Sequence, residues 1–294
     1  RGQRWRLAIR PKTLGLSLVP VLAGTWFAAK SGVFRLDVLA VAAPAAVAIQ
    51  IGTNLWNDTA DATKGTDGPD RLGPPRVTSL GLLSAKQVRT GAALAFLAAA
   101  VLGLYLAVPG GWPILLVGLI SLTMGYLYSM GPRPLSGTPL GEALVVAFFG
   151  VAAVTGTAYL HGLPPNSHVL LLGLVIGLPA AAVLLVNNHR DRVQDARSGR
   201  RTLAIILGER ASRVLYAMLL LLTIAGSFGL VRPCALGVLP FVAVLALAAV
   251  LIWQMIRAPN STRLNRLILG TSAFQVLVLF ALIASTAICG AGSP

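Results

Sequence analysis

The sequence predicts an all-α protein that crosses a membrane many times. Of its 294 residues, 56% are hydrophobic and only 11% are charged, and the mean hydropathy is +0.78. Soluble domains carry charge on about a quarter of their residues, so a water-soluble fold is excluded. The apolar residues form long runs, each near the roughly 20 residues that a helix needs to cross a hydrocarbon core. We expect one transmembrane domain over residues 1–294.

Nine apolar runs follow one another, and each is expected to be a transmembrane helix. The third and fourth are separated only by residues 108–113, where Pro and Gly predict a tight turn. The nine expected helices cover residues 14–29, 38–56, 91–108, 113–129, 141–160, 169–188, 214–231, 236–256 and 267–289.

Positive charge lies almost entirely on one side of this predicted bundle. With a cytoplasmic N-terminus, 21 of the 24 Lys and Arg residues fall in cytoplasmic segments, and only Lys30, Arg35 and Arg232 fall on the other side. Short basic loops resist translocation, so the N-terminus is predicted to be cytoplasmic. The net charge of +15 then reflects topology and contact with anionic headgroups. No soluble basic domain is predicted that could bind nucleic acid.

Two cysteines and two histidines are expected on the outer side. Cys234 and Cys289 lack the spacing of a metal site, and two free thiols in an apolar setting are expected rather than a disulfide. His161 and His168 fall in one outer connection, where they are expected to be a solvated pair rather than a metal site.

Carboxylates are rare and concentrated. Six of the nine form two clusters, each at the cytoplasmic exit of an apolar run. Carboxylates near a bilayer are costly and are therefore candidates for function. Spacings of i, i+3 in the first pair and i, i+4 in the second put each pair on one face, provided that the helix continues through it. The pairs are Asp58 with Asp61 and Asp191 with Asp195, and the first is followed by Asp67 and Asp70.

These clusters are rich in oxygen ligands and contain no cysteine or paired histidine. Asn54 and Asn57 add amide oxygens to the face that carries the first acidic pair. Magnesium takes one or two carboxylates and completes its shell with water and phosphate oxygens. We expect Mg²⁺, with Mn²⁺ as an alternative, bound by Asn57, Asp58, Asp61, Asp67, Asp191 and Asp195.

Cations interleaved with the acids predict that the bound anion is a diphosphate. Basic side chains bind phosphate oxygens through charge-assisted hydrogen bonds. Solvated ion pairs between loop arginines and the acids are the alternative; such pairs stabilise little and leave the asparagines and the doubled arrangement unexplained. The cations are Lys64, Arg71 and Arg76 after the first cluster, and Arg190, Arg192, Arg197, Arg200 and Arg201 around the second.

Two motifs resemble the signatures of the UbiA-type family of intramembrane aromatic prenyltransferases. Residues 57–61, Asn-Asp-Thr-Ala-Asp, are similar to its N-D-x-x-D motif, and residues 191–195 to its D-x-x-x-D motif. The chain departs from the family at Gly65, where relatives often carry a third acid, and at Arg200, where they carry Lys. Further similar segments are 10–13, 128–134, 140–142 and 264–271, and the runs 64–77 and 187–204 resemble the branch that prenylates 1,4-dihydroxy-2-naphthoate in menaquinone synthesis.

The resemblance implies nine helices around a central cavity, with cytoplasmic cap loops after the second and sixth helices. It implies transfer of a polyprenyl group from polyprenyl diphosphate to 1,4-dihydroxy-2-naphthoate, with loss of CO₂ and diphosphate, in a bacterial cell membrane. Asp58, Asp61, Asp191 and Asp195 would be catalytic. The implied substrate-binding residues are Lys12, Asn54, Lys64, Arg71, Arg76, Tyr126, Tyr128, Asn187, Asn188, Arg190, Arg200 and Arg201.

Three alternatives stay open at this point. The acceptor could be another aromatic acid, such as 4-hydroxybenzoate or homogentisate. A protein that binds lipid diphosphates without catalysis would carry the same charges. A transporter would also bury charges among helices, although transporter sites usually lie near the membrane midplane and these clusters lie at helix ends.

Overall fold

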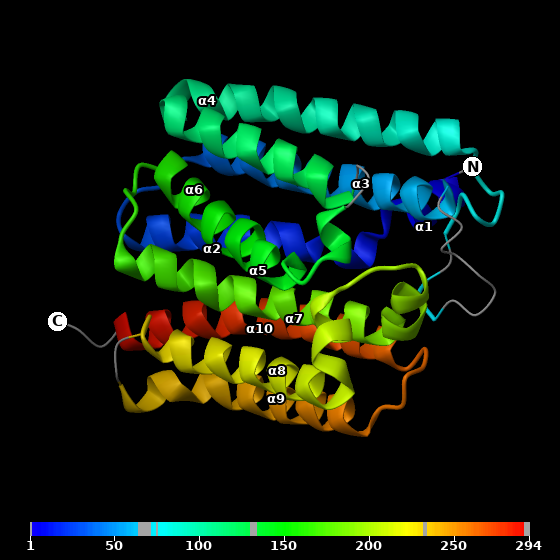
Figure 1. Ribbon diagram of the computed structural model, residues 1–294. Coiled ribbons are helices and arrows are strands. Elements are labelled where there is room, and N and C mark those ends of the chain that lie inside the picture. Colours follow the sequence, from blue (N-terminus) through cyan, green and yellow to red (C-terminus); the bar gives the residue numbers. More distant parts are fainter. Residues whose placement is uncertain (1, 64–71, 75, 130–133, 232–233, 291–294) are drawn as a thin grey trace.

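The computed structural model describes residues 2–63, 72–74, 76–129, 134–231 and 234–290, and this part of the chain contains helices and no strands. The predicted all-α class is confirmed. Figure 1 shows the helices as a bundle of nearly parallel and antiparallel rods. The elements are α1 Gly2–Ile9, η1 Pro11–Thr13, α2 Gly15–Lys30, α3 Leu36–Thr63, α4 Ala85–Ser129, η2 Leu135–Gly137, α5 Gly141–Val145, η3 Val146–Ala152, α6 Ala153–Leu160, α7 Ser167–Arg197, α8 Leu203–Phe228, η4 Ala235–Val238, α9 Leu239–Arg257 and α10 Leu264–Gly290.

The long helix α4 contains two of the predicted segments. Its 45 residues would measure about twice the thickness of a hydrocarbon core if it were straight. Gly111 interrupts it with a φ of 65°, a left-handed conformation that glycine adopts readily. Figure 1 shows α4 turning back on itself, so that its two limbs run side by side. The turn predicted at 108–113 is therefore present.

The predicted count of nine spans is not confirmed. Within the described residues, seven helices are long and apolar enough to cross a membrane, or eight if the bent pair formed by Gly2–Thr13 and Gly15–Lys30 is one span. That tally counts α4 once. Many apolar side chains on α4 are exposed, among them Leu94, Leu97 and Leu104, as expected for a surface that faces lipid.

Helix α7 lies at the centre of the bundle. It packs against α2, α5, α6, α8 and α10. In its most apolar 18-residue stretch 72% is buried, compared with 22% in the corresponding stretch of α4. Its small and branched side chains, including Leu172, Ile176, Ala181 and Leu185, belong to the largest apolar core. The second acidic cluster therefore lies on the helix that the rest of the protein surrounds.

Two helices extend beyond their predicted ends and through the acidic clusters. α3 continues to Thr63, and α7 continues to Arg197. The condition for the predicted pairs to share a helix face is thus met for Asp58 with Asp61 and for Asp191 with Asp195. Polar side chains can continue a helix past the apolar run that anchors it, which is why hydropathy alone placed these ends too early.

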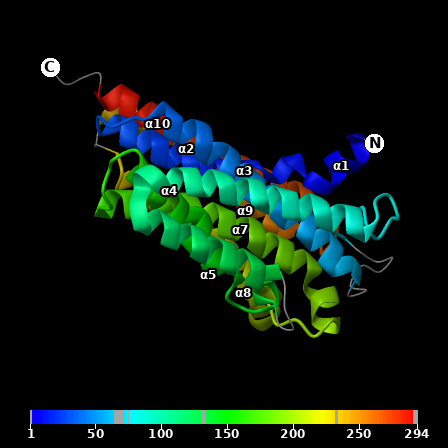
Figure 2. The ribbon, with the colours of Figure 1, turned by 90° about the horizontal axis from the view of Figure 1, so that it is seen from above.

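The two ends of the bundle differ in character. Figures 1 and 2 both show the start of α1 and the end of α10 at opposite ends of the bundle, and Figure 1 shows the α7–α8 and α9–α10 connections at the same end as α1, the N-terminal end. The acids of α3 and α7 lie at the N-terminal end, because both helices run toward it and carry Asp58, Asp191 and Asp195 in their last two turns.

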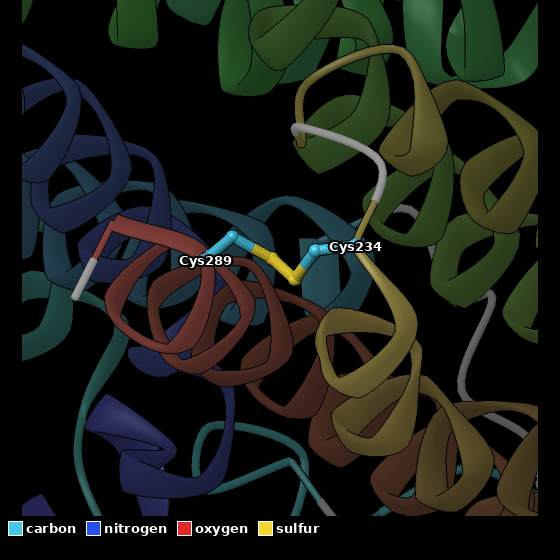
Figure 3. The surroundings of a disulfide bond; sticks show 2 residues. All are labelled: Cys234 and Cys289. Atoms are coloured by element: carbon cyan, nitrogen blue, oxygen red, sulfur yellow. A yellow bond between two sulfur atoms is a disulfide. The ribbon is translucent and has the colours of Figure 1, made fainter. Parts of the chain in front are cut away.

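The expectation of free thiols was wrong, because Cys234 and Cys289 form a disulfide (Figure 3). The two residues are 55 positions apart in the sequence. α9 and α10 pack against each other as an antiparallel pair, and this pairing returns the end of α10 to the start of α9. Sequence spacing contains no information on this return.

The expectation of a solvated histidine pair was also wrong for His161, which is buried. Its Nδ1 accepts a hydrogen bond from the Arg35 backbone N–H at 3.0 Å. Its Nε2 lies 3.0 Å from Thr25 Oγ1, and since Nδ1 is an acceptor, Nε2 carries the proton and donates it. His161 thus joins the ends of α2 and α6 to the start of α3, whereas His168 is exposed as expected.

Candidate active site

The first acidic cluster holds the chain segment that returns after α3. The Asp58 carboxylate is buried and accepts hydrogen bonds from the backbone N–H groups of Val77 at 3.0 Å and Thr78 at 2.9 Å. A carboxylate has about four acceptor positions, so Asp58 keeps capacity for a further ligand. Asn57, on the same helix, is half-buried.

Asn54 connects α3 to the junction of α1 and α2. Its side-chain amide donates to the Ile9 carbonyl at 2.8 Å and to Thr13 Oγ1 at 3.1 Å. Its oxygen accepts from Gln50 Nε2 at 3.3 Å. The predicted substrate-binding residue Lys12 lies in η1 at this junction and is exposed. Asn54 therefore fixes the junction that carries Lys12.

The second cluster is organised around a buried arginine. The Arg190 guanidinium donates to both carboxylate oxygens of Asp191, at 2.8 and 2.6 Å. It also donates to Asn187 Oδ1 at 2.7 Å and to Asn265 Oδ1 at 2.6 Å. Arg190 is only 2% exposed, and a buried charge needs such partners. Three predicted site residues, Arg190, Asp191 and Asn187, therefore form one network.

Asp195 and the predicted phosphate ligands after α7 lie one turn further along. Arg200 donates to Asp195 Oδ1 at 3.1 Å. The backbone N–H of Arg201 donates to the Gly137 carbonyl at 2.8 Å, and the Arg201 side chain is exposed. Each acid of the second pair is therefore next to an arginine, which is the interleaving that a diphosphate requires.

Asn265 connects the two acidic clusters, a role that no spacing in the sequence predicts. It accepts from Arg190 and donates from Nδ2 to the Leu72 carbonyl at 3.0 Å. Leu72 belongs to the connection whose later residues, Val77 and Thr78, are held by Asp58. Val77 and Thr78 are thus tied to α3, and Leu72 is tied through α10 to α7. Only an arrangement in three dimensions could have revealed this link.

Asn188 lies on the buried side of α7. Its amide donates to Glu142 Oε1 at 2.9 Å, so this predicted substrate-binding residue is engaged with a carboxylate that the sequence did not place in the site. Tyr128, at the end of α4, is half-buried near this pair, whereas Tyr126 is 55% exposed. The Tyr128 hydroxyl lies near Gly141, the residue before Glu142 in the chain, so this predicted tyrosine lies beside described site residues.

Several predicted site residues cannot be placed. Lys64, Asp67 and Arg71 lie outside the described residues, and so does the side chain of Asp61, although its backbone belongs to α3. Arg76 is buried at the start of the turn that Asp58 holds.

The oxygen ligands that are described fit magnesium in kind. No group of three or more His, Cys, Asp or Glu side chains comes together among the described residues. Magnesium does not need such a group, because it binds proteins through one or two carboxylates and completes its shell with water and substrate phosphates. Asp191 and Asp195 offer two carboxylates on one helix, with arginines beside them for the anion.

A membrane-embedded helical bundle with acids and arginines interleaved at one end is the arrangement of an intramembrane prenyltransferase. The model of the UbiA prenyltransferase family matches residues 17–277, and the chain belongs to this family. It is 37% identical over 219 residues to the 1,4-dihydroxy-2-naphthoate octaprenyltransferase of Mycobacterium tuberculosis, covering 74% of each chain. It is 34% identical over 232 residues to the Escherichia coli protein of the same name, covering 75% of this chain and 74% of that one.

Solved structures share the fold. The UbiA homologue from Aeropyrum pernix K1 superposes with a TM-score of 0.70 at 15% identity, over 94% of this chain and 98% of that chain. A UbiA homologue from Archaeoglobus fulgidus bound to DMAPP and Mg²⁺ gives a TM-score of 0.66 at 12% identity, over 97% and 99%.

Proposed function

We propose that this protein transfers a polyprenyl group from polyprenyl diphosphate to 1,4-dihydroxy-2-naphthoate, with loss of CO₂ and diphosphate, and so forms demethylmenaquinone in its reduced, quinol form. The observation that carries this proposal is the identity of 33–37% to five bacterial proteins that bear the name of this activity, over about three quarters of the chain. The paired acids and arginines at one end of the bundle supply the chemistry that such a reaction requires.

In this proposal the acids bind a divalent metal and the basic residues bind the diphosphate. Asn57, Asp58, Asp61, Asp67, Asp191 and Asp195 would hold Mg²⁺, with Mn²⁺ as a substitute. When bound, the metal supplies a Lewis acid that takes up charge on the departing diphosphate. Arg190 and Arg200 already lie against the second acidic pair, and Lys12, Lys64, Arg71, Arg76 and Arg201 complete the cationic set.

The first step is cleavage of the bond between the allylic carbon and the diphosphate oxygen, whose electron pair leaves with diphosphate. The ring carbon that carries the carboxylate then attacks the allylic carbon. Tyr128 can face the cation through its aromatic ring. The segment 72–78, tied to both clusters, would exclude water that could otherwise capture the cation.

The proposed reaction is tested with purified protein in detergent, one prenyl diphosphate and a panel of aromatic acids. Naphthoate labelled in its carboxyl carbon should be prenylated with release of the label as CO₂, and excess EDTA should abolish turnover. 4-Hydroxybenzoate should be a poor acceptor, because a single ring leaves part of an apolar cavity without contacts. Retention of the label in the product, or preference for 4-hydroxybenzoate, would show that 1,4-dihydroxy-2-naphthoate is not the acceptor in the proposed reaction. Binding or transport of prenyl diphosphate without release of diphosphate would show that the protein is not a prenyltransferase.

We further propose that the end of the bundle that carries the acids faces the cytoplasm of a bacterial cell. Of the 24 Lys and Arg residues, 21 lie in segments predicted on this side, and the disulfide lies at the other end, as suits an oxidising compartment. In a background without Cys234 and Cys289, a cysteine at the exposed Ser198 should react with an impermeant thiol reagent only in inverted vesicles. A cysteine at the exposed Ser31 should react in intact cells, and the reverse pattern would invert the topology.

A further inference from the structure

Glu142 is a carboxylate buried inside a membrane-spanning segment. It opens α5, within the apolar span from Gly141 to Leu160, and is 5% exposed. Its Oε1 accepts the hydrogen bond from Asn188, but its Oε2 has no hydrogen-bond partner among the described residues, although it is buried. Burial of a carboxylate oxygen without a partner is costly, and such a group in a candidate membrane span points to function.

The groups around Glu142 come from separate elements. Asn188 lies on α7, Tyr128 ends α4, and Arg200 follows α7. The Tyr128 hydroxyl lies 3.9 Å from where a Cβ on Gly141 would stand, and Gly141 precedes Glu142 in the chain; Glu142 and Arg200 are charged groups near this phenol. One carboxylate, one phenol and one guanidinium therefore converge beside the second acidic cluster.

The position of Glu142 is fixed by unusually close packing of its helix against α7. A Cβ added at Gly150 would lie only 2.7 Å from the Gly177 Cα, so a methyl group cannot be accommodated there without movement. Gly150 lies in η3, a π-helical segment that continues α5. Such segments are rare and frequently occur at functional sites. The glycine contact brings α5 near enough for Glu142 to reach Asn188.

Glu142 lies on the membrane side of the diphosphate-binding residues. Its partner Asn188 precedes Asp191 by three residues and Asp195 by seven, which is about 4.5 and 10 Å along the helix axis. The reacting allylic carbon is attached directly to the diphosphate, and the rest of the prenyl chain extends into the membrane. An aromatic ring that attacks this carbon has to lie next to it, at the level where Glu142 and Tyr128 are found.

We propose that Glu142 is the residue that accepts and returns the proton of the acceptor hydroxyl. This inference rests on the proposed function. As the ring carbon forms its bond to the allylic carbon, the neighbouring hydroxyl becomes a ketone and its proton moves to Oε2. The bond to the carboxylate then breaks, CO₂ leaves, and the electron pair that it leaves behind enters the ring. The ketone oxygen recovers the proton from Glu142, so that no proton is gained or lost overall.

The test is the substitution Glu142→Gln, which preserves shape and can still accept the hydrogen bond from Asn188. Turnover of the naphthoate near neutral pH should fall about 100-fold or more, the usual contribution of a positioned base. The loss should shrink as pH rises from 6.5 to 8.5, because the acceptor hydroxyl then ionises without help. Binding of prenyl diphosphate, measured without acceptor, should be unchanged. The matched control is Glu209→Gln, since Glu209 is an exposed partner of Arg192 and Arg213; it should leave turnover unchanged.

Folding is checked by thermal unfolding of each variant. If Glu142→Gln does not fold, Glu142→Asp and Glu142→Asn are compared instead. Their side chains have equal length, and only Glu142→Asp, which keeps a carboxylate, should retain turnover. Equal turnover of Gln and Glu at every pH, or a loss that is the same at every pH, would overturn the inference. If the wild-type protein prenylates a different acid and not the naphthoate, the proposed acceptor fails. The same comparison on that other acid then decides the role of Glu142.

Discussion

Arg190 and Asp191 form the most densely hydrogen-bonded pair of the candidate site. The guanidinium is buried and contacts Asp191, Asn187 and Asn265 from three positions on two helices. The carboxylate itself is partly accessible. Asp191 is therefore held in a fixed orientation and can still receive a ligand, which is what a preorganised site needs.

Asp191→Ala should lower turnover by about two to three powers of ten, or about 3 to 4 kcal/mol, the scale for loss of one preorganised group. Asp61→Ala should act similarly. The control is Asp37→Ala, because the Asp37 carboxylate forms an exposed ion pair with Arg35 and such pairs contribute little. Turnover is measured at saturating substrate beside thermal unfolding. Equal losses at positions 37 and 191 would show that the acids affect folding and not the reaction.

The burial of His161 predicts that the stability of the fold depends on pH. Burial, and then the nearby Arg35 charge, lower the pKa of this histidine below its ordinary value of about 6.5. The unfolded chain therefore binds the proton first, and stability should fall as pH is lowered from about 7.5 to 5.5. Protonation also breaks the hydrogen bond from Arg35, because Nδ1 can no longer accept. The midpoint of thermal unfolding reports this loss.

His161→Gln should flatten this pH dependence, whereas His168→Gln, at an exposed position of the same connection, should preserve it. An unchanged slope in His161→Gln would assign the dependence to other groups.

Among the helices, the contact between η3 and α7 sets how close Glu142, the proposed acceptor-side residue, lies to the acids of α7. Gly150, Gly173 and Gly177 face one another across it, and a Cβ on Gly150 would clash with the Gly173 carbonyl oxygen. Backbone atoms cannot move aside as a flexible side chain can. The two helices would have to separate.

Gly150→Ala should therefore destabilise the protein by about 1 to 3 kcal/mol, the usual cost of overpacking, and should also reduce turnover by displacing Glu142. Gly156→Ala, in α6, is the matched control, since a Cβ there meets nothing within 4 Å; it should be neutral or slightly stabilising. Thermal unfolding and turnover are measured for both. A neutral Gly150→Ala would mean that the helices separate at little cost.

For the molecule as a whole, the disulfide and the site lie at opposite ends of the bundle. The Cys234–Cys289 bond closes the α9–α10 pair at the end where the C-terminus lies (Figures 1 and 3). It acts mainly on the unfolded chain, where it closes a loop between residues 55 positions apart and so lowers the conformational entropy of the unfolded state.

Replacing both cysteines by serine should lower stability by about 2 to 4 kcal/mol while turnover stays within about twofold of wild type at 25 °C. Thermal unfolding with and without reductant, beside turnover, checks this. Reductant should not change the unfolding of the double variant. A large loss of turnover at a temperature where the variant remains folded would show that the two ends are coupled.

The class of the fold and the two acidic pairs at helix ends follow from the amino-acid sequence alone. Hydropathy depends only on composition along the chain, so the helices and the turn at 108–113 were predictable, as were the paired acids at the ends of two apolar runs. Motif spacing predicted which faces of α3 and α7 the acids share, because that spacing follows from helix geometry alone.

The groups that meet across helices are known only from the packing of the bundle. The link from Asp58 to residues 77–78, the bridge from Arg190 through Asn265 to Leu72, the pairing of Glu142 with Asn188, the burial of His161 and the Cys234–Cys289 bond all join residues far apart in the chain. Their partners depend on how helices pack, and packing is set by side-chain shape over the whole bundle, including the glycines that let α5 and η3 approach α7.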